Sequence, residues 1–258
     1  MTFGSAATLR LDMRGSTPRL ANGAIWQITE PLPGWSRPRG DGLATELAIG
    51  RRLRLLEPAP WPPGEAGGLR WRVRLLEDGY PCWLDTQALL SHGQPSDPPV
   101  LPRLDRSSIK ARLPQVLSFA KESLSEKNCY RWGGTIGPNY DCSGLVQRSF
   151  AQAGIWLPRD AYLQERFCRP VAVRPDDVGL LQSGDLIFFG SPQRCTHVAL
   201  HLGQGRYLHS SGRDHGRNGL GVDDLFSANH DPVACHYRAE LRGAGRVMHS
   251  HDGSPLPP

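Results

Sequence analysis

The proline-rich segment near the middle of the chain limits its fold more than any other feature. Its four prolines are Pro95, Pro98, Pro99 and Pro102. Proline fixes φ and removes a backbone donor, so this segment predicts an extended linker rather than part of a sheet or helix. We place the linker at residues 96–107. It separates a domain over 1–95 from a second domain over 108–240, which a flexible tail over 241–258 follows.

The segment before the linker has the alternation of short, half-buried strands. In "LRWRVRL" apolar residues alternate with arginines, and Leu53 and Leu55 repeat the pattern in "RRLRLLE". A period of two is typical of a strand with one buried face. The turn "EDGY" precedes a further strand, "PCWLD", and "APWPPGEAGG" predicts a loop. Roughly five short strands in this region predict a small β-barrel.

The pattern changes after the linker. "LPQVLSFAKESL", over 113–124, has apolar residues at helical spacing, with Pro114 in the first turn. A second helix is predicted over 143–153, ending before Gly154. "LQSGDLIFFG" predicts a turn and a central strand, and "THVALHLGQGRYLHSSG" predicts a hairpin. Helices followed by strands indicate an α+β domain.

Composition and charge argue against several classes of function. The net charge is +5, the pI is near 9.0 and the 30 basic residues are scattered, so nucleic-acid binding is not predicted. No apolar run is long enough to span a membrane. The N-terminus lacks a basic segment followed by an apolar one, so we expect a cytoplasmic protein. The six cysteines form no CxxC pair, which favours reduced thiols.

One cysteine lies where a nucleophile could act. In "NYDCSGLVQRSF", Cys142 follows Asp141 at the predicted start of the helix over 143–153. Unpaired N–H groups at a helix N-terminus favour a thiolate and can donate to an oxyanion. A buried structural cysteine is the alternative, and it holds unless the chain supplies a base.

The predicted hairpin supplies a base. In "THVALHLG", His197 and His201 lie on one face of the strand and three apolar residues lie on the other. If Leu202 pairs with Arg206, then His209 on the return strand becomes the diagonal neighbour of His197, within side-chain reach. The sequence is equally compatible with a second register, in which Leu202 pairs with Tyr207. One imidazole would act as base for the thiol while the other orients it.

A zinc site formed by His197, His201 and His209 is the metal alternative. Three imidazoles are adequate ligands for zinc. However, His197 and His201 are about 13 Å apart if the strand rises about 3.3 Å per residue. That separation is too long for one ion, so neither a metal nor another cofactor is predicted.

Several motifs, in order, resemble the NlpC-type cell-wall cysteine peptidases, which are papain-like enzymes. These motifs are "YRWGG", "DCSGLV", "LPRDAYLQ", "GDLIFF", "THVALHLG" and "YLHSSG", within residues 108–238. The resemblance implies that Cys142 is the nucleophile, that His197 is the base and that His209 orients the base. It also implies that Tyr130 lines the active site and assists the nucleophile or the oxyanion.

The N-terminal segment, ending in "DGYPCWLD", resembles the bacterial SH3-like domains that precede such peptidases. Chains of this kind resemble γ-D-glutamyl-L-diamino acid endopeptidases, which cut murein peptides that have a free N-terminal L-Ala. The resemblance implies one pocket for the γ-D-Glu unit and an anionic group for the L-Ala ammonium. The candidate substrate-binding residues are Tyr80, Asp141, Ser143, Asp160, Arg159 and Glu46.

These candidates have different expected roles. Asp141, and Glu46 as a second anion, would bind the ammonium. Asp160 with Ser143 would belong to the γ-D-Glu pocket, and Arg159 would either aid the α-carboxylate or support its loop. Tyr80, in "DGYP", would either close the active site or belong to the core of the β-barrel.

Two other functions fit the same sequence. An amidase or acyltransferase would use the same cysteine and histidines with a different acyl acceptor. A non-catalytic wall-binding module is the third possibility, but it has no need of a nucleophile and a base. The expected partner in each case is a murein peptide or the wall itself.

Overall fold

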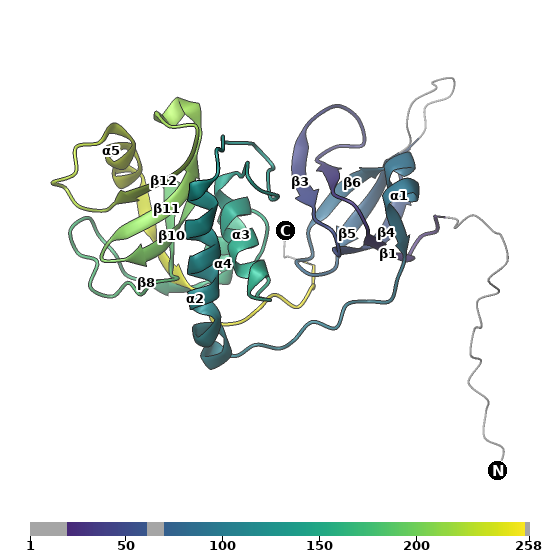
Figure 1. Cartoon of the computed structure of the whole chain (residues 1–258), viewed down its shortest axis with the longest axis horizontal. Coiled ribbons are helices and arrows are strands. Elements are labelled where there is room, and N and C mark those ends of the chain that lie inside the picture. Colours follow the sequence, from purple (N-terminus) through teal and green to yellow (C-terminus); the bar gives the residue numbers. More distant parts are fainter. Residues whose placement is uncertain (1–19, 61–69, 256–258) are drawn as a thin grey trace, which may run out of the picture.

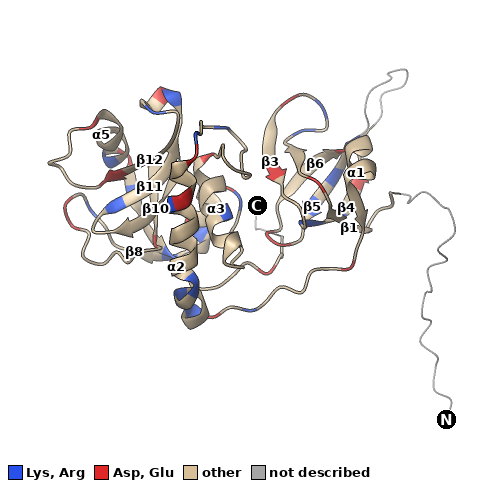
Figure 2. Ribbon diagram, viewed as in Figure 1, with Lys and Arg blue, Asp and Glu red and all other residues tan. Residues whose placement is uncertain are grey.

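An N-terminal sheet domain and a larger domain of helices and strands lie side by side (Figure 1). The structure, a computed structural model, describes residues 20–60 and 70–255. Most of the predicted loop "APWPPGEAGG" and the start of the predicted 1–95 domain lie outside these residues. Among the described helices, none combines the length and the apolarity needed to cross a membrane. Basic and acidic residues are interspersed over both domains (Figure 2).

The N-terminal domain is a seven-stranded antiparallel sheet with the order β3-β2-β6-β5-β4-β1-β7. Its elements are β1 (Ile25–Ile28), β2 (Leu32–Trp35), β3 (Leu43–Leu47), β4 (Arg52–Pro58), β5 (Arg70–Leu75), β6 (Pro81–Asp85), α1 (Thr86–His92) and β7 (Gly93–Pro95). The predicted alternation is confirmed. Leu53, Leu55, Val73 and Leu75 are fully buried, whereas the arginines between them are at least partly exposed.

The second domain is α+β, as predicted, and has a six-stranded sheet with the order β12-β11-β10-β9-β13-β8. Its helices are α2 (Arg106–Glu122), α3 (Cys142–Gln152), α4 (Ala161–Phe167), α5 (Pro232–Ala239) and the short 3₁₀ turns η1 (Ser123–Ser125) and η2 (Arg213–His215). Its strands are β8 (Arg169–Val171), β9 (Leu186–Ser191), β10 (Arg194–Gly203), β11 (Arg206–Ser211), β12 (Gly219–Asp224) and β13 (Leu241–Arg246).

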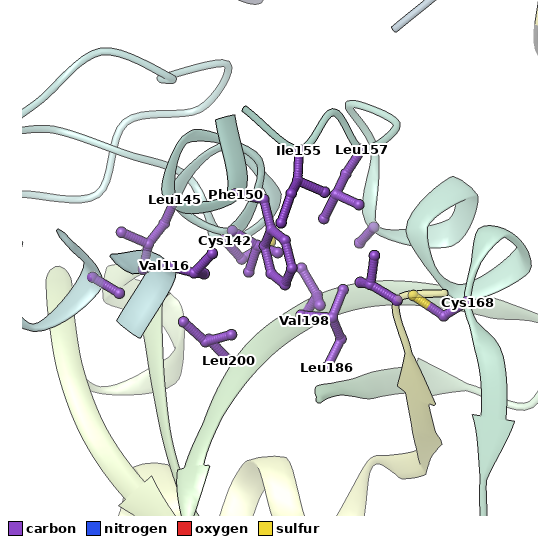
Figure 3. Close-up of a cluster of buried hydrophobic side chains, with 14 of the residues drawn as sticks. Val116, Cys142, Leu145, Phe150, Ile155, Leu157, Cys168, Leu186, Val198 and Leu200 are labelled. Atoms are coloured by element: carbon purple, nitrogen blue, oxygen red, sulfur yellow. The ribbon is translucent and has the colours of Figure 1, made fainter. Parts of the chain in front are cut away.

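Helices cover both faces of this sheet. On one face, α2 and α3 pack Val116, Leu145 and Phe150 against Val198 and Leu200 of β10 (Figure 3). On the other face, a second apolar cluster joins α5 to β9, β10 and β11. Because both faces of β9 and of the middle of β10 are buried, the polar side chains in the middle of β10, such as His197 and His201, are enclosed.

The predicted hairpin is confirmed, and so is the first of its two registers. Leu200 pairs with Leu208 and His201 pairs with Tyr207. A bulge follows, so that Gly203 rather than residue 202 lies opposite Arg206. The register makes the two strand histidines of the predicted site diagonal neighbours.

The helix predicted over 113–124 is longer than expected, and Pro114 lies inside α2 rather than in its first turn. The true N-cap is Asp105, whose carboxylate accepts from the N–H of Ser108 at 2.8 Å. The helix therefore begins inside the predicted linker. Pro114 removes one internal hydrogen bond, and packing of the apolar face of α2 maintains the helix.

The prediction of a flexible tail over 241–258 is wrong for the residues that the structure describes. Residues 241–246 form β13, which lies between β9 and β8 in the sheet. The segment after it is also fixed. The N–H of His251 donates to the carbonyl of Trp156 at 2.8 Å, and the His251 side chain is buried.

The C-terminal segment runs back between the two domains (Figure 1). On the side of the second domain, Ser250 accepts from the N–H of Trp156 at 2.9 Å. On the barrel side, Gly79 and Gly253 lie so close to the backbone that an added Cβ would collide with the carbonyls of Ser254 and Leu76, respectively. The segment thus acts as a strap that packs against both domains.

Replacing Gly79 by alanine should lower the free energy of unfolding by about 2–4 kcal/mol. Its φ of +71° already disfavours a side chain, and the new Cβ would displace the strap at Ser254. Gly23→Ala is the matched control, because Gly23 has a φ of +81° but open space around it. The control should cost only about 1–2 kcal/mol. Equal losses in urea denaturation would show that the strap contributes nothing.

Candidate active site

Cys142 is the first residue of α3, as predicted, and Asp141 is the N-cap. The Asp141 carboxylate accepts from the N–H of Gly144 at 2.6 Å and from that of Gly133 at 2.9 Å. An added Cβ at Gly144 would collide with the carbonyl of Gly134, so the start of the helix packs directly on the loop of the "YRWGG" motif. These contacts fix the direction in which the Cys142 side chain leaves the helix.

A chain of four side chains begins at the predicted base. Nε2 of His197 lies 2.8 Å from Nδ1 of His209. Nε2 of His209 lies 2.6 Å from the carboxylate of Asp223, which Arg217 binds with two contacts of 2.7 and 2.9 Å. The side chains of His209 and Asp223 are both buried. The predicted pairing of His197 with His209 is thus confirmed by geometry, and the structure extends it by two residues.

The carboxylate at the end of this chain sets the tautomers of both rings. A carboxylate can only accept, so Nε2 of His209 must carry the proton in the contact with Asp223. Nδ1 of a neutral His209 is then an acceptor and takes the N–H of His197 Nε2. His197 Nδ1 is therefore left with a free lone pair. The N–H of the next residue, Val198, donates to the Cys142 sulfur, so the thiol lies beside this part of β10.

Aromatic rings hold the base in place. The ring of Tyr237 stacks on His197 with centroids 4.2 Å apart and an angle of 28°. The Tyr237 hydroxyl lies 2.9 Å from the hydroxyl of Ser211, which fixes the tyrosine in turn. Phe189 contacts the same imidazole at 5.8 Å. Because Tyr237 comes from α5, the helix behind the sheet contributes directly to positioning the His197 imidazole.

Sequence reasoning missed Asp223, Arg217 and Tyr237. Asp223 lies on β12, where Gly221 pairs with His209, so Asp223 is a diagonal neighbour of His209. The argument that found His209 would have found Asp223 if "GLGVDD" had been assigned as a strand. Glycine at 221 is also needed, because an added Cβ there would overlap the Arg217 guanidinium.

Cys142 lies in a cavity of about 650 Å³ formed by both domains. The lining residues are Ser36, Gly42, Leu43, Ala44, Tyr80, Tyr130, Trp132, Asp141, Cys142, Ser143, Arg159, Asp160, Ala161, Tyr162, Arg194, Cys195 and Thr196. All the predicted site residues except His197, His209 and Glu46 are among them. Trp132 is 73% exposed, so its indole lies at the rim of the cavity.

Asp141 and Arg159 neutralise each other and leave no free charge for a substrate. Arg159 is 2% exposed, and its two terminal nitrogens lie 3.1 and 2.6 Å from the Asp141 carboxylate oxygens. It also donates to the hydroxyls of Ser143 at 2.9 Å and Thr45 at 3.2 Å. The structure therefore supports Arg159 as a residue that holds its loop, and it gives Asp141 a partner other than an ammonium.

Tyr80 and Asp160 join the barrel to the cavity. The Tyr80 hydroxyl donates to the Asp160 carboxylate at 3.3 Å. Burial raises the pKa of Tyr80 and also that of Asp160, which the charge of Arg159 opposes. Tyr80 is thus a wall of the cavity that also contacts the barrel core. Asp160 is the lining carboxylate that is not in an ion pair within the described residues.

The prediction that Glu46 faces the substrate is wrong, because its carboxylate is used between the domains. It accepts from the N–H groups of Thr135 and Ile136, both at 3.0 Å, and pairs with Arg131 at 2.8 Å. It lines a separate small cavity near Trp156. Its function in the structure is to fix the 131–140 loop against β3.

His201, the third histidine of the metal alternative, has other partners. Its Nδ1 lies 2.9 Å from the carbonyl of Gln182, and its Nε2 accepts from the N–H of Gly205 at 3.1 Å. Both ring nitrogens thus bind backbone next to the hairpin turn. His201 is a buried structural residue of that turn.

The comparisons with known proteins decide the family of the catalytic domain. The NlpC/P60 family matches residues 127–236, the segment that carries Cys142, His197, His209 and Asp223. This chain contains an NlpC/P60 domain. A second family, the bacterial dipeptidyl-peptidase SH3 domain, matches residues 35–89. The predicted resemblance of both domains is therefore confirmed.

Individual relatives share parts of this chain. The bifunctional muramidase/DL-endopeptidase CwlT of Bacillus subtilis is 36% identical over 132 residues, which are 49% of this chain and 35% of that protein. The gamma-D-glutamyl-L-lysine dipeptidyl-peptidase of Bacillus cereus is 43% identical over 84 residues, 31% of this chain and 24% of the relative. A solved NlpC/P60 protein from Bacillus cereus is 26% identical with a TM-score of 0.43, covering 88% of this chain and 64% of that one. The matches thus span about a third or less of the two curated relatives.

Burial dominates the charge states of Cys142 and His197 in the NlpC/P60 domain. Together with the charge of Asp141, it raises the pKa of the Cys142 thiol to about 12, although N–H donation from Val198 opposes this rise. Burial also lowers the pKa of His197 well below 6.5. The resting pair is therefore a neutral thiol and a neutral imidazole. Desolvation outweighs the N–H donors at the helix N-terminus, which by themselves favour a thiolate.

Alkylation of Cys142 by iodoacetamide should consequently rise with pH from 7 to 10 without reaching a plateau. The thiolate is the reacting form, and a thiol with a pKa of about 12 gains thiolate throughout this range. Mass spectrometry of the Cys142 peptide measures the rate, with the exposed Cys129 as an internal reference. A plateau below pH 7 would instead indicate a preformed thiolate–imidazolium pair.

Proposed function

We propose that this chain is a cysteine peptidase that hydrolyses the bond between γ-D-Glu and a diamino acid in murein peptides with a free N-terminal L-Ala. The relay from Asp223 through His209 to His197, beside a cysteine at a helix N-terminus, is the observation that supports it most strongly. Such an arrangement suits acyl transfer through a thioester.

The reaction follows from the tautomers. The Cys142 sulfur attacks the γ-carbonyl carbon as its proton passes to Nδ1 of His197. The resulting imidazolium is stabilised through His209 by the carboxylate of Asp223. N–H groups at the start of α3, with Tyr130 nearby, would stabilise the oxyanion. The C–N bond then breaks, and His197 protonates the leaving amine of the diamino acid.

Water completes the cycle. His197 takes a proton from the water, whose oxygen attacks the thioester carbonyl, and the Cys142 thiol leaves with that proton. The products are L-Ala-γ-D-Glu and the diamino acid or the peptide that begins with it. The barrel limits the substrate, because Tyr80 and Leu43 line the cavity from the N-terminal domain.

Mass spectrometry of the products from L-Ala-γ-D-Glu-diaminopimelate tests this proposal. The wild type should release L-Ala-γ-D-Glu, and Cys142→Ala should release none. Incubation in H₂¹⁸O should place one ¹⁸O in the dipeptide. Transfer of the acyl group to an added amine at the expense of hydrolysis would favour a transferase. Binding without turnover by the wild type would favour a wall-binding module.

A further inference from the structure

The cavity contains two charged groups that are not in an ion pair within the described residues. Its charged lining residues are Asp141, Asp160, Arg159 and Arg194. Asp141 and Arg159 pair at 2.6 Å and are almost fully enclosed. Asp160 and Arg194 therefore provide one anion and one cation for a ligand. A ligand that satisfies both must itself carry a positive and a negative charge.

Arg194 is held in a position from which its donors can reach a ligand. It is the first residue of β10 and pairs with Ser191 across a tight turn. Its guanidinium carbon lies 4.8 Å from the centre of the Tyr162 ring. Within the described part of the chain, no oxygen accepts a hydrogen bond from this guanidinium. Stacking on an aromatic face leaves the N–H edges of an arginine available for bidentate binding of a carboxylate.

Arg194 and Asp160 lie close to each other. Tyr162 is two residues after Asp160, at the start of α4, so the ring that supports Arg194 belongs to the segment that carries the carboxylate. The charge of Arg194 acts on Asp160. No direct ion pair joins the two side chains within the described residues. The space between opposite charges suits a short zwitterion.

We propose that Arg194 determines specificity by binding the free α-carboxylate of the γ-linked D-Glu, while Asp160 binds the ammonium of the preceding residue. This inference rests on the proposed function. Because D-Glu is joined through its γ-carboxyl group, its α-carboxylate stays ionised next to the bond that is cut. Arg159, the residue that sequence reasoning offered for this carboxylate, has its donors directed at Asp141, Ser143 and Thr45.

Two substrates and three variants test this assignment. The substrates are L-Ala-γ-D-Glu-diaminopimelate and the same peptide with the D-Glu α-carboxylate converted to a carboxamide. The wild type should cleave the carboxylate form with a kcat/KM about 10- to 100-fold higher, as expected for a hydrogen bond between charged groups. In Arg194→Gln, kcat/KM for the carboxylate substrate should fall by this factor, whereas kcat/KM for the carboxamide substrate should change less than twofold. Arg194→Lys should recover part of the preference.

Arg166→Gln is the matched control. Arg166 also stacks on Tyr162, at 5.7 Å, but does not line the cavity. The Arg166→Gln variant should keep the wild-type preference for the carboxylate substrate. Equal loss on both substrates in Arg194→Gln, or equal cleavage of both by the wild type, would overturn the assignment.

If the proposed function is wrong, the wild type will cleave neither peptide. Isothermal titration calorimetry would then test the binding role of Arg194 separately. Cys142→Ala should bind the dipeptide L-Ala-γ-D-Glu about 10-fold or more tightly than its α-carboxamide, and the added Arg194→Gln change should remove the difference. Equal affinities, or no binding of either dipeptide, would contradict it.

Discussion

Replacing Asp223 by asparagine should lower kcat about 10²- to 10⁴-fold without unfolding the protein. Oδ2 of Asp223 lies 2.6 Å from Nε2 of His209 and accepts from Nη1 of Arg217 at 2.7 Å. A neutral amide in its place removes the negative charge that would stabilise an imidazolium at His197 through His209.

Steady-state kinetics on the murein peptide, together with thermal unfolding, would measure this effect. Asp224→Asn is the control, because Asp224 is the adjacent residue of β12 and its carboxylate accepts from Phe226 and Asn229 instead of from His209. It should retain activity within a few-fold. A similarly mild effect of Asp223→Asn would mean that His209 alone orients the base.

Replacing Arg159 by methionine should lower the free energy of unfolding by about 3–5 kcal/mol. The change leaves the Asp141 carboxylate buried without its ion pair, at the N-terminus of the helix that carries the nucleophile. It also removes the contact with Thr45 of the barrel. Urea denaturation would measure the loss.

Arg166→Met, at an exposed position of α4, should change the free energy of unfolding by less than about 0.5 kcal/mol. Arg159→Lys should recover only part of the loss, because lysine cannot form the paired contacts with both oxygens. If Arg159→Met is as stable as the wild type, the buried pair with Asp141 does not support the site.

Local patterns were enough to predict the centre of the site. A cap residue before an apolar helix placed Cys142, and the period of two in the hairpin brought His197 and His209 together. The same rule did not reach Asp223, because "GLGVDD" has only two alternating apolar residues, its two glycines have low strand propensity, and it follows the irregular segment after β11. Tyr237 was missed because α5 reaches His197 only through tertiary packing.

The errors in the fold and in the roles of charged residues have one physical cause. "LRGAGR" is rich in glycine and has low strand propensity, but it pairs with β9 and β8, where neighbouring strands supply its partners. Asp141 and Glu46 were expected to bind the substrate ammonium, and Arg159 was expected either to aid the α-carboxylate or to support its loop. The structure gives each of them a protein partner that is distant in sequence, and local reasoning has no access to such pairs.

The most direct test of the account is the requirement for a free amine. Purified protein would be given L-Ala-γ-D-Glu-diaminopimelate and the same peptide acetylated on L-Ala, beside Cys142→Ala as a blank. The account predicts rapid cleavage of the free peptide, none by the variant and little cleavage of the acetylated form, whose neutral amide cannot pair with Asp160. Equal cleavage of both peptides would contradict it.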